Sequence, residues 1–113
     1  MKIELRFCGV EGSDALREYM LRRVHFQLTR FAHELDTVVV RMSDINGPKG
    51  GIDKRCKVTV RGPRIGSLTL AELTGDAYSA LDLAIGRISR AVSRDVARTR
   101  AAHGARTSMR GAS

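Results

Sequence analysis

The stretch Asp76–Arg100, DAYSALDLAIGRISRAVSRDVARTR, decides the fold because it is a long segment with one apolar side. Its apolar residues recur every three or four positions, which places them on one side of an α-helix. They are Tyr78, Leu81, Ile85, Ile88, Val92 and Val96. Asp76 is the expected N-cap, and Gly104 is expected to end any helical tendency. Such a helix must bury its apolar side against other elements of the chain.

A second amphipathic segment lies near the N-terminus. Ser13 is a good N-cap with Asp14 in the first turn, and the pattern predicts a helix over residues 14–33. The side expected to face inward comprises Leu16, Met20, Val24, Gln27, Leu28 and Phe31.

Four segments have the alternating or β-branched pattern of strands. They are Lys2–Val10, Leu35–Ile45, Asp53–Gly62 and Gly66–Thr74. The last two are expected to form a hairpin, and the strand-helix-strand start predicts a parallel first pair of strands. The order β-α-β-β-β-α therefore predicts an α+β fold, in which two helices pack on one face of a four-stranded mixed sheet.

The side of the last helix opposite its apolar residues carries arginines. About 100° per residue places Arg87, Arg90, Arg94 and Arg98 in one row about 16 Å long. We expect no acidic residue within this row, with Asp95 directed elsewhere. A solvated helix face usually mixes charges, whereas a row of like charges favours a phosphate backbone as partner. A plain solvated surface stays the alternative.

Charge is concentrated toward the C-terminus. The 113 residues fit one domain and include 20 basic and 12 acidic residues, a formal net charge of +8. Arginine accounts for 16 of the basic residues, which favours nucleic acid but is also what a high-GC codon bias would produce. Residues 85–113 hold seven basic residues and one acidic residue. We expect a domain over residues 1–100 and a basic, disordered tail over 101–113.

Several function classes lack their usual sequence signals. The two cysteines form no CxxC pair and the histidines have no metal-ligand spacing, so no metal or cofactor is predicted. No nucleophile, base and orienting residue assemble, so we predict a chain that is not an enzyme and has no small-molecule substrate. There is no signal peptide and no run of about 18 apolar residues, so we expect a cytoplasmic protein without a membrane partner.

Three motifs resemble those of one family. The run Asp76-Ala-Tyr78-Ser-Ala80-Leu81-Asp82, followed by Arg87, Arg90 and Arg94, resembles the D-x-Y-x-A-I-D…K…R…K signature of the ribosome hibernation promoting factor and ribosome-associated inhibitor A family. The family is also called ribosomal S30AE or sigma-54 modulation protein. Asp14–Tyr19 resembles its "EALREY" helix opening, and Asp44–Cys56 resembles a variant glycine-rich loop. The resemblance spans residues 2–100.

The resemblance implies a double-stranded-RNA-binding-like fold and a function in translation regulation under stress. It implies a hibernation factor that binds 16S rRNA of the small ribosomal subunit near the decoding centre and blocks the path of mRNA and tRNA. Long members carry a second, C-terminal dimerisation domain that this sequence lacks, so no ribosome pairing by that route is expected. The older family name leaves an alternative, a protein-interaction module that modulates transcription through a sigma factor.

The residues expected to contact RNA come from several segments. By position in the family motifs they are Arg22, Arg23, Arg87, Arg90 and Arg94, and the helical row adds Arg98. Lys49 lies within the glycine-rich loop NGPKGG (46–51) and Lys54 follows it, and a plain hairpin connection is the alternative for this loop. Arg55 shares a strand face with Lys57 and Arg61, and this face is either an edge-protecting device or a second RNA patch.

Gln27 and Phe26 depart from the family pattern, and they leave open the register of the late first helix and the role of Arg30.

Overall fold

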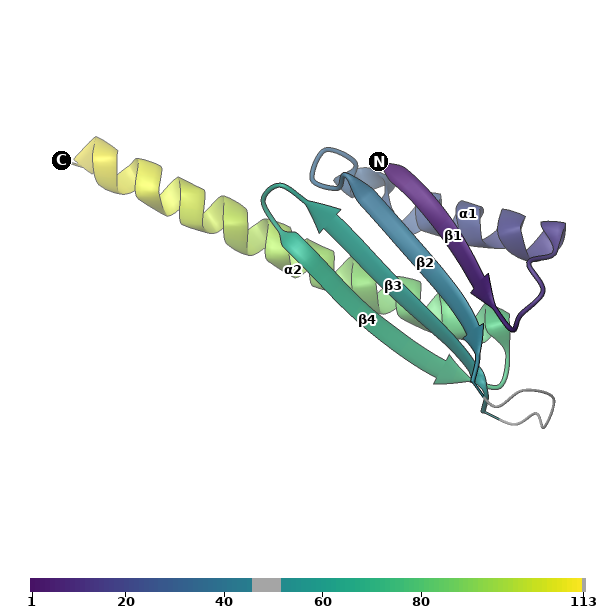
Figure 1. The fold of residues 1–113 in the computed structure, drawn as a ribbon. Coiled ribbons are helices and arrows are strands. Elements are labelled where there is room, and N and C mark those ends of the chain that lie inside the picture. The colour runs from purple at the N-terminus through teal and green to yellow at the C-terminus, as the bar shows by residue number, and fades with distance from the viewer. Residues whose placement is uncertain (46–51, 113) are drawn as a thin grey trace.

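The computed structural model describes residues 1–45 and 52–112, with side chains as far as residue 101. The expected glycine-rich loop and Lys49 lie outside the described residues. Figure 1 shows how the strands and helices are arranged. The elements in chain order are β1 (Lys2–Cys8), α1 (Asp14–Leu28), the 3-10 helix η1 (Thr29–Phe31), β2 (Thr37–Asp44), β3 (Lys54–Gly62), β4 (Gly66–Thr74) and α2 (Ala77–Ala112).

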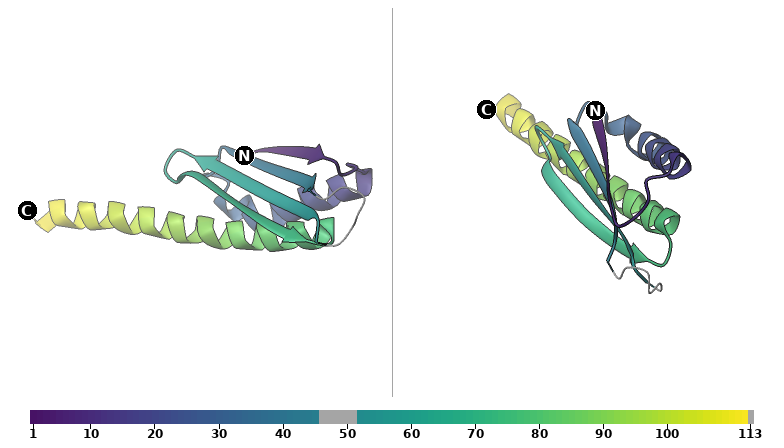
Figure 2. Two further views of the ribbon diagram at one scale, coloured as in Figure 1. Left: turned by 60° about the horizontal axis from the view of Figure 1, so that its bottom comes forward. Right: turned by 45° about the vertical axis from the view of Figure 1, so that its right-hand side comes forward.

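The four strands form one mixed sheet in the order β1-β2-β3-β4. β1 pairs with β2 in parallel, and the β2–β3 and β3–β4 pairs are antiparallel. Both helices lie on the same side of this sheet, with α2 against β3 and β4 and α1 beside α2 (Figure 2). The predicted α+β fold, its element order and its layer arrangement are confirmed.

The core lies between the sheet and the helices because strand residues alternate in direction. The fully buried strand side chains are Val38, Val40, Met42, Cys56, Val58 and Val60. α1 and α2 contribute apolar sides close to those that their spacing predicted, with Met20, Val24, Leu81, Ile85, Ile88 and Val92 fully buried. Tyr78, predicted on the apolar side of α2, is instead 39% exposed and packs its ring against Tyr19. The other face of the sheet is left without a covering element among the described residues (Figure 2).

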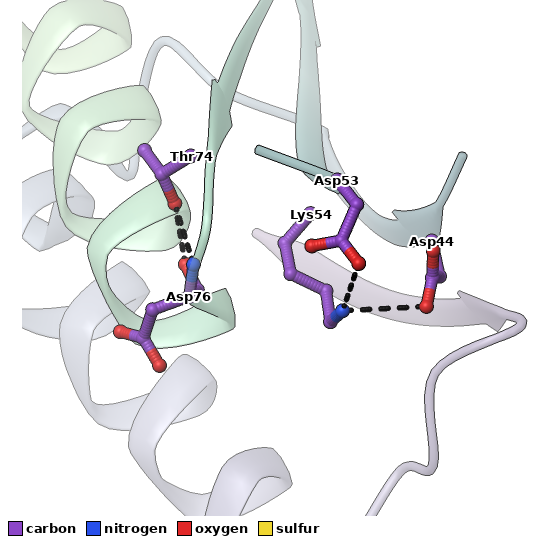
Figure 3. Close-up of polar contacts among 5 residues, drawn as sticks. All are labelled: Asp44, Asp53, Lys54, Thr74 and Asp76. Atoms are coloured by element: carbon purple, nitrogen blue, oxygen red, sulfur yellow. Dashed lines mark hydrogen bonds and ion pairs between the residues drawn. The ribbon is translucent and has the colours of Figure 1, made fainter. Parts of the chain in front are cut away.

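Both predicted N-caps are confirmed by hydrogen bonds that satisfy otherwise unpaired backbone groups. The backbone N–H of Leu16 donates to Ser13 Oγ at 3.2 Å, and that of Ser79 donates to Asp76 Oδ2 at 2.9 Å. The N–H of Asp76 in turn donates to Thr74 Oγ1 at 3.2 Å, which fixes the turn from β4 into α2 (Figure 3).

The two helices end differently from the sequence prediction. α1 ends at Leu28 rather than near residue 33 and continues into η1, where the His25 carbonyl accepts hydrogen bonds from both the backbone N–H and the hydroxyl of Thr29. α2 continues through Ala112, so the prediction that helical structure ends at Gly104 was wrong. A single glycine costs a helix only about 1 kcal/mol relative to alanine, and the flanking alanines and arginines are good helix formers. The division into a domain of residues 1–100 and a tail of 101–113 stays a prediction.

Candidate functional site

The predicted arginine row lies on α2, on the side away from the core. Arg87, Arg90, Arg94 and Arg98 are all exposed, whereas Ile88 and Val92 between them are buried. The side chain of Arg90 extends back along the helix, since a Cβ atom placed at Gly86 would lie 4.0 Å from its Nη1. The helical period predicted this arrangement correctly.

The two ends of the row have acidic partners that the sequence prediction did not expect. Arg87 forms an ion pair with Glu72 of β4, and Arg98 forms one with Asp95, three residues before it. The prediction that Asp95 is directed away from the row was therefore wrong, and the partner of Arg87 lies outside the helix. The position of residues around the helix axis could not reveal Glu72, because it belongs to β4. The long side chain of Arg98 reaches Asp95 across the surface of the same helix.

The centre of the row remains cationic. Within residues 1–45 and 52–101, neither Arg90 nor Arg94 forms an ion pair. The rise of 1.5 Å per residue places the two residues about 6 Å apart along the axis. Two exposed guanidinium groups at this spacing can each offer a planar pair of donors to a phosphate.

Arg22 and Arg23 of α1 have different surroundings. Arg22 is exposed, whereas Arg23 is partly buried with its Nε 3.3 Å from Asp82 Oδ1 of α2. The Tyr19 hydroxyl donates to the same carboxylate at 2.7 Å, and this hydrogen bond raises the pKa of Tyr19. Asp82 therefore links α1 to α2, and Arg23 contributes to that link.

Two residues outside the predicted site lie on the same helix layer. The Phe26 ring is 76% exposed, and the Arg23 guanidinium carbon lies 5.7 Å from its centroid. Arg30 donates to Ser89 Oγ of α2 at 3.3 Å and stacks 4.6 Å over Phe31. An exposed phenylalanine beside arginines is the signal that could have identified Phe26, since such rings stack on unpaired bases.

The register of the late α1 helix is now defined. Gln27 is partly buried, and its backbone carbonyl accepts a hydrogen bond from Ser89 Oγ at 3.3 Å. The Ser89 hydroxyl of α2 therefore accepts a hydrogen bond from Arg30 and donates one to the Gln27 carbonyl, so both residues contact α2 at this point. Phe26 is exposed in this register.

Lys54 lies apart from the helix surface, at the start of β3 (Figure 3). Its Nζ is 3.0 Å from Asp53 Oδ2 and 3.3 Å from Asp44 Oδ2, and the hydrogen bond with Asp53 is the main cause that raises the pKa of Lys54. Asp53 is only 1% exposed, so its charge needs this partner. This geometry gives Lys54 a structural role at the start of the strand.

Arg55 is exposed on the face of the sheet that the helices leave open. The nine residues predicted to contact RNA thus fall into separate groups. Six of them lie on the two helices, Arg22 and Arg23 on α1 and Arg87, Arg90, Arg94 and Arg98 on α2, whereas Lys54 and Arg55 lie on β3. Lys49 is outside the described residues.

The remaining polar groups include histidines, cysteines and acidic residues, the side chains that bind metal ions. No group of three His, Cys, Asp or Glu side chains is placed to hold a metal ion there. Cys56 is buried, and its burial raises the pKa of the thiol to about 12. Among the helices that the structure describes, none combines the length and apolarity needed to cross a membrane.

Comparisons with known proteins support the resemblance seen in the sequence. A ribosomal subunit interface protein from Coxiella burnetii has a similar fold, with a TM-score of 0.71 and 26% identity over 86% of this chain and 99% of that one. The N-terminal domain of Thermus thermophilus Protein Y gives a TM-score of 0.66 and 26% identity over 83% and 98% of the two chains. No curated protein sequence matches. Residues 3–100 match the family described as Sigma 54 modulation protein / S30EA ribosomal protein, and the chain therefore belongs to that family.

Proposed function

We propose that this chain is a ribosome-associated hibernation factor that binds 16S rRNA of the small subunit through its helix layer and blocks the mRNA and tRNA path near the decoding centre. The observation that carries the proposal is the cationic centre of α2, where Arg90 and Arg94 are exposed without an ion-pair partner in the described part of the chain. Membership of the family supplies the class of partner. The Coxiella burnetii neighbour is itself described as a ribosomal subunit interface protein.

The proposed mechanism is occupation of space rather than chemistry. Arg90 and Arg94 would pair with rRNA phosphates, and Arg22 on α1 would add a third contact on the same layer. An A-form RNA helix hides its base edges in a deep, narrow groove, so shape and phosphate contacts would dominate. The exposed Phe26 ring would stack on an unpaired base at the edge of this contact.

The experiment that tests this function is co-sedimentation of the purified chain with separated small and large ribosomal subunits across a salt series. We expect saturable binding to the small subunit at about one copy each, with affinity falling steeply as salt rises. mRNA and initiator tRNA should then compete with the bound chain. Weak, unsaturable binding to both subunits would contradict the proposal.

A second candidate function follows from the other half of the family description, modulation of sigma 54. It requires a protein partner that complements the cationic centre of α2, and so an acidic one. Affinity capture from nuclease-treated extract distinguishes the two, because removal of RNA would leave this partner bound and would release ribosomal proteins.

A further inference from the structure

The face of the sheet opposite the helices carries a second set of basic side chains. Strand residues that alternate with the buried ones point to this open face, and its basic members come from β1, β2 and β3. They are Lys2, Arg6, Arg41, Arg55, Lys57 and Arg61, all exposed. The helices lie on the other side of the sheet, so this set is separate from the α2 arginines (Figure 2).

Three of these residues stand side by side across the sheet. Arg6 of β1 is in register with Arg41 of β2, and Arg41 is in register with Lys57 of β3. Neighbouring strands are about 4.8 Å apart, so the row spans about 10 Å. Like charges directly opposite each other destabilise a sheet, so this row is costly to the free protein.

Acidic residues neutralise little of this charge. Glu4 is the acidic residue at the outward positions of the described strands, and it pairs with Arg6 at 3.1 Å. Arg41, Arg55, Lys57 and Arg61 form no ion pair within the described side chains. The net charge of the open face is therefore strongly positive at its centre.

Protection of the sheet edges does not explain this distribution. Edge strands are β1 and β4, and a protective device places charges there. The outward positions of β4 are instead uncharged, with Ser67, Thr69, Ala71 and Leu73. Most of the charge lies on the central strands β2 and β3, so the alternative of edge protection is not supported.

The chemistry of the face fits a phosphate backbone better than a protein. The cores of protein interfaces are enriched in aromatic residues and depleted of charge, whereas here charge fills the centre and no outward strand position holds an aromatic ring. Arg6, Arg41 and Lys57 line a hollow on this face together with Val39 and Thr59. No aromatic ring stands at an outward position of these strands to stack on a base, so phosphate contacts would dominate and recognition would depend little on RNA sequence.

We propose that the open face of the sheet is a second RNA-binding surface, which holds the phosphate backbone of an RNA segment distinct from the one on the helix layer. Because the two surfaces lie on opposite sides of the molecule, one chain joins two RNA segments. This inference does not depend on which RNA the helix layer binds. It assigns Arg41 and Lys57 as the central contacts.

The test uses short oligouridylates labelled with either a donor or an acceptor dye. The unmodified chain should bring both dyes together and bind two RNA copies in native mass spectrometry. Arg41→Glu/Lys57→Glu should lose the energy transfer and retain one copy. Arg90→Glu/Arg94→Glu should also retain one copy, and ultraviolet crosslinks should then map to β2 and β3.

Three results would overturn the proposal. They are loss of all RNA binding in Arg90→Glu/Arg94→Glu, retention of both copies in Arg41→Glu/Lys57→Glu, and displacement of RNA from the open face by equimolar polyglutamate. The variant Arg41→Thr/Lys57→Thr is the control for folding, because it removes two like charges that face each other and because threonine is favoured in β-strands. It should melt no lower than the unmodified chain, while the slope of log affinity against log salt falls by about 2.

Discussion

Gly62 illustrates how a single residue permits the close approach of two segments. A Cβ atom at this position would lie 1.8 Å from the carbonyl oxygen of Glu34, in the connection between η1 and β2. The same two stretches of chain are joined by a hydrogen bond from the Asp36 N–H to the Arg61 carbonyl at 2.7 Å. Space rather than backbone conformation therefore requires glycine here.

We predict that Gly62→Ala lowers the free energy of unfolding by about 1–3 kcal/mol or more, because the backbone must move to admit the methyl group. Urea denaturation measures the change. Gly86→Ala is the matched control, since its new methyl group meets nothing closer than Arg90 Nη1 at 4.0 Å. That helical substitution should raise the free energy of unfolding by about 0.5–1 kcal/mol. Equal midpoints for Gly62→Ala and the unmodified chain would contradict the contact.

The two cysteines should differ in reactivity. Cys8 is exposed, whereas Cys56 is buried with a pKa raised to about 12 by desolvation, and the thiolate is the reactive form. We predict that an aromatic disulfide reagent modifies one thiol per native chain near neutral pH and both thiols after denaturation. The variant Cys8→Ser should be unreactive when native. Rapid reaction of that variant would show that Cys56 is accessible.

At the scale of elements, the sequence predicted which side chains of a helix or strand face the core, but it did not predict contacts between different elements. Alternation in β3 placed Cys56 inward and Arg55 outward, and the helical period of α2 placed Arg90 opposite the core. The Arg87–Glu72 ion pair joins α2 to β4, so no pattern within either segment reveals it. The basic row on the open face of the sheet also could not be predicted, because Arg6, Arg41 and Lys57 are far apart along the chain and only the strand register places them side by side.

Helix ends were predicted less well than helix interiors for local reasons. The expected helix continues past Leu28 as η1, where Thr29 donates to the His25 carbonyl with both its backbone N–H and its hydroxyl. Gly104 was expected to end α2, yet one glycine among good helix formers is a small cost that the element absorbs. Whether a single residue such as Thr29 or Gly104 ends a helix therefore depends on the residues around it.

The ion pair at the end of the arginine row gives an element-scale prediction. Asp95→Asn releases Arg98 for a phosphate, so affinity for RNA should rise several-fold and the salt slope should steepen by about 1. The free energy of unfolding should fall by less than about 1 kcal/mol, because exposed ion pairs contribute little. Glu11→Gln, an exposed change of the same charge in the β1–α1 connection, is the control for net charge. Equal affinity gains in both variants would mean that Arg98 makes no contact.

At the scale of the whole molecule, the fold is one sheet with two oppositely directed basic surfaces. The helix layer presents Arg90 and Arg94, and the open face presents Arg41 and Lys57. Val96 is the last buried residue of α2 among the side chains described, which reach residue 101, and Arg100 of the same helix pairs with Glu34 at 2.8 Å. The helix then extends past the sheet (Figure 1).

We predict that removal of residues 101–113 weakens RNA binding while it leaves the stability of the fold nearly unchanged. The melting temperature should change by only a few degrees, since Val96 and the Arg100–Glu34 pair are retained. Affinity for the small ribosomal subunit should fall several-fold, because the segment carries the basic residues Arg106 and Arg110. Calorimetry and sedimentation measure the two quantities. Unchanged affinity would mean that this segment does not contact RNA.

The most direct test of the central claim is the affinity of charge-reversed helix variants for the small ribosomal subunit at one fixed salt concentration. Arg94→Glu should bind at least about tenfold more weakly, and Arg90→Glu/Arg94→Glu about a hundredfold more weakly, with unchanged circular dichroism. Arg64→Glu makes the same charge change as Arg94→Glu at an exposed position in the β3–β4 turn, and it should bind nearly as the unmodified chain does. Equal weakening by Arg64→Glu and Arg94→Glu, or full binding by the double variant, would contradict the assignment of the helix layer as the ribosome-binding surface.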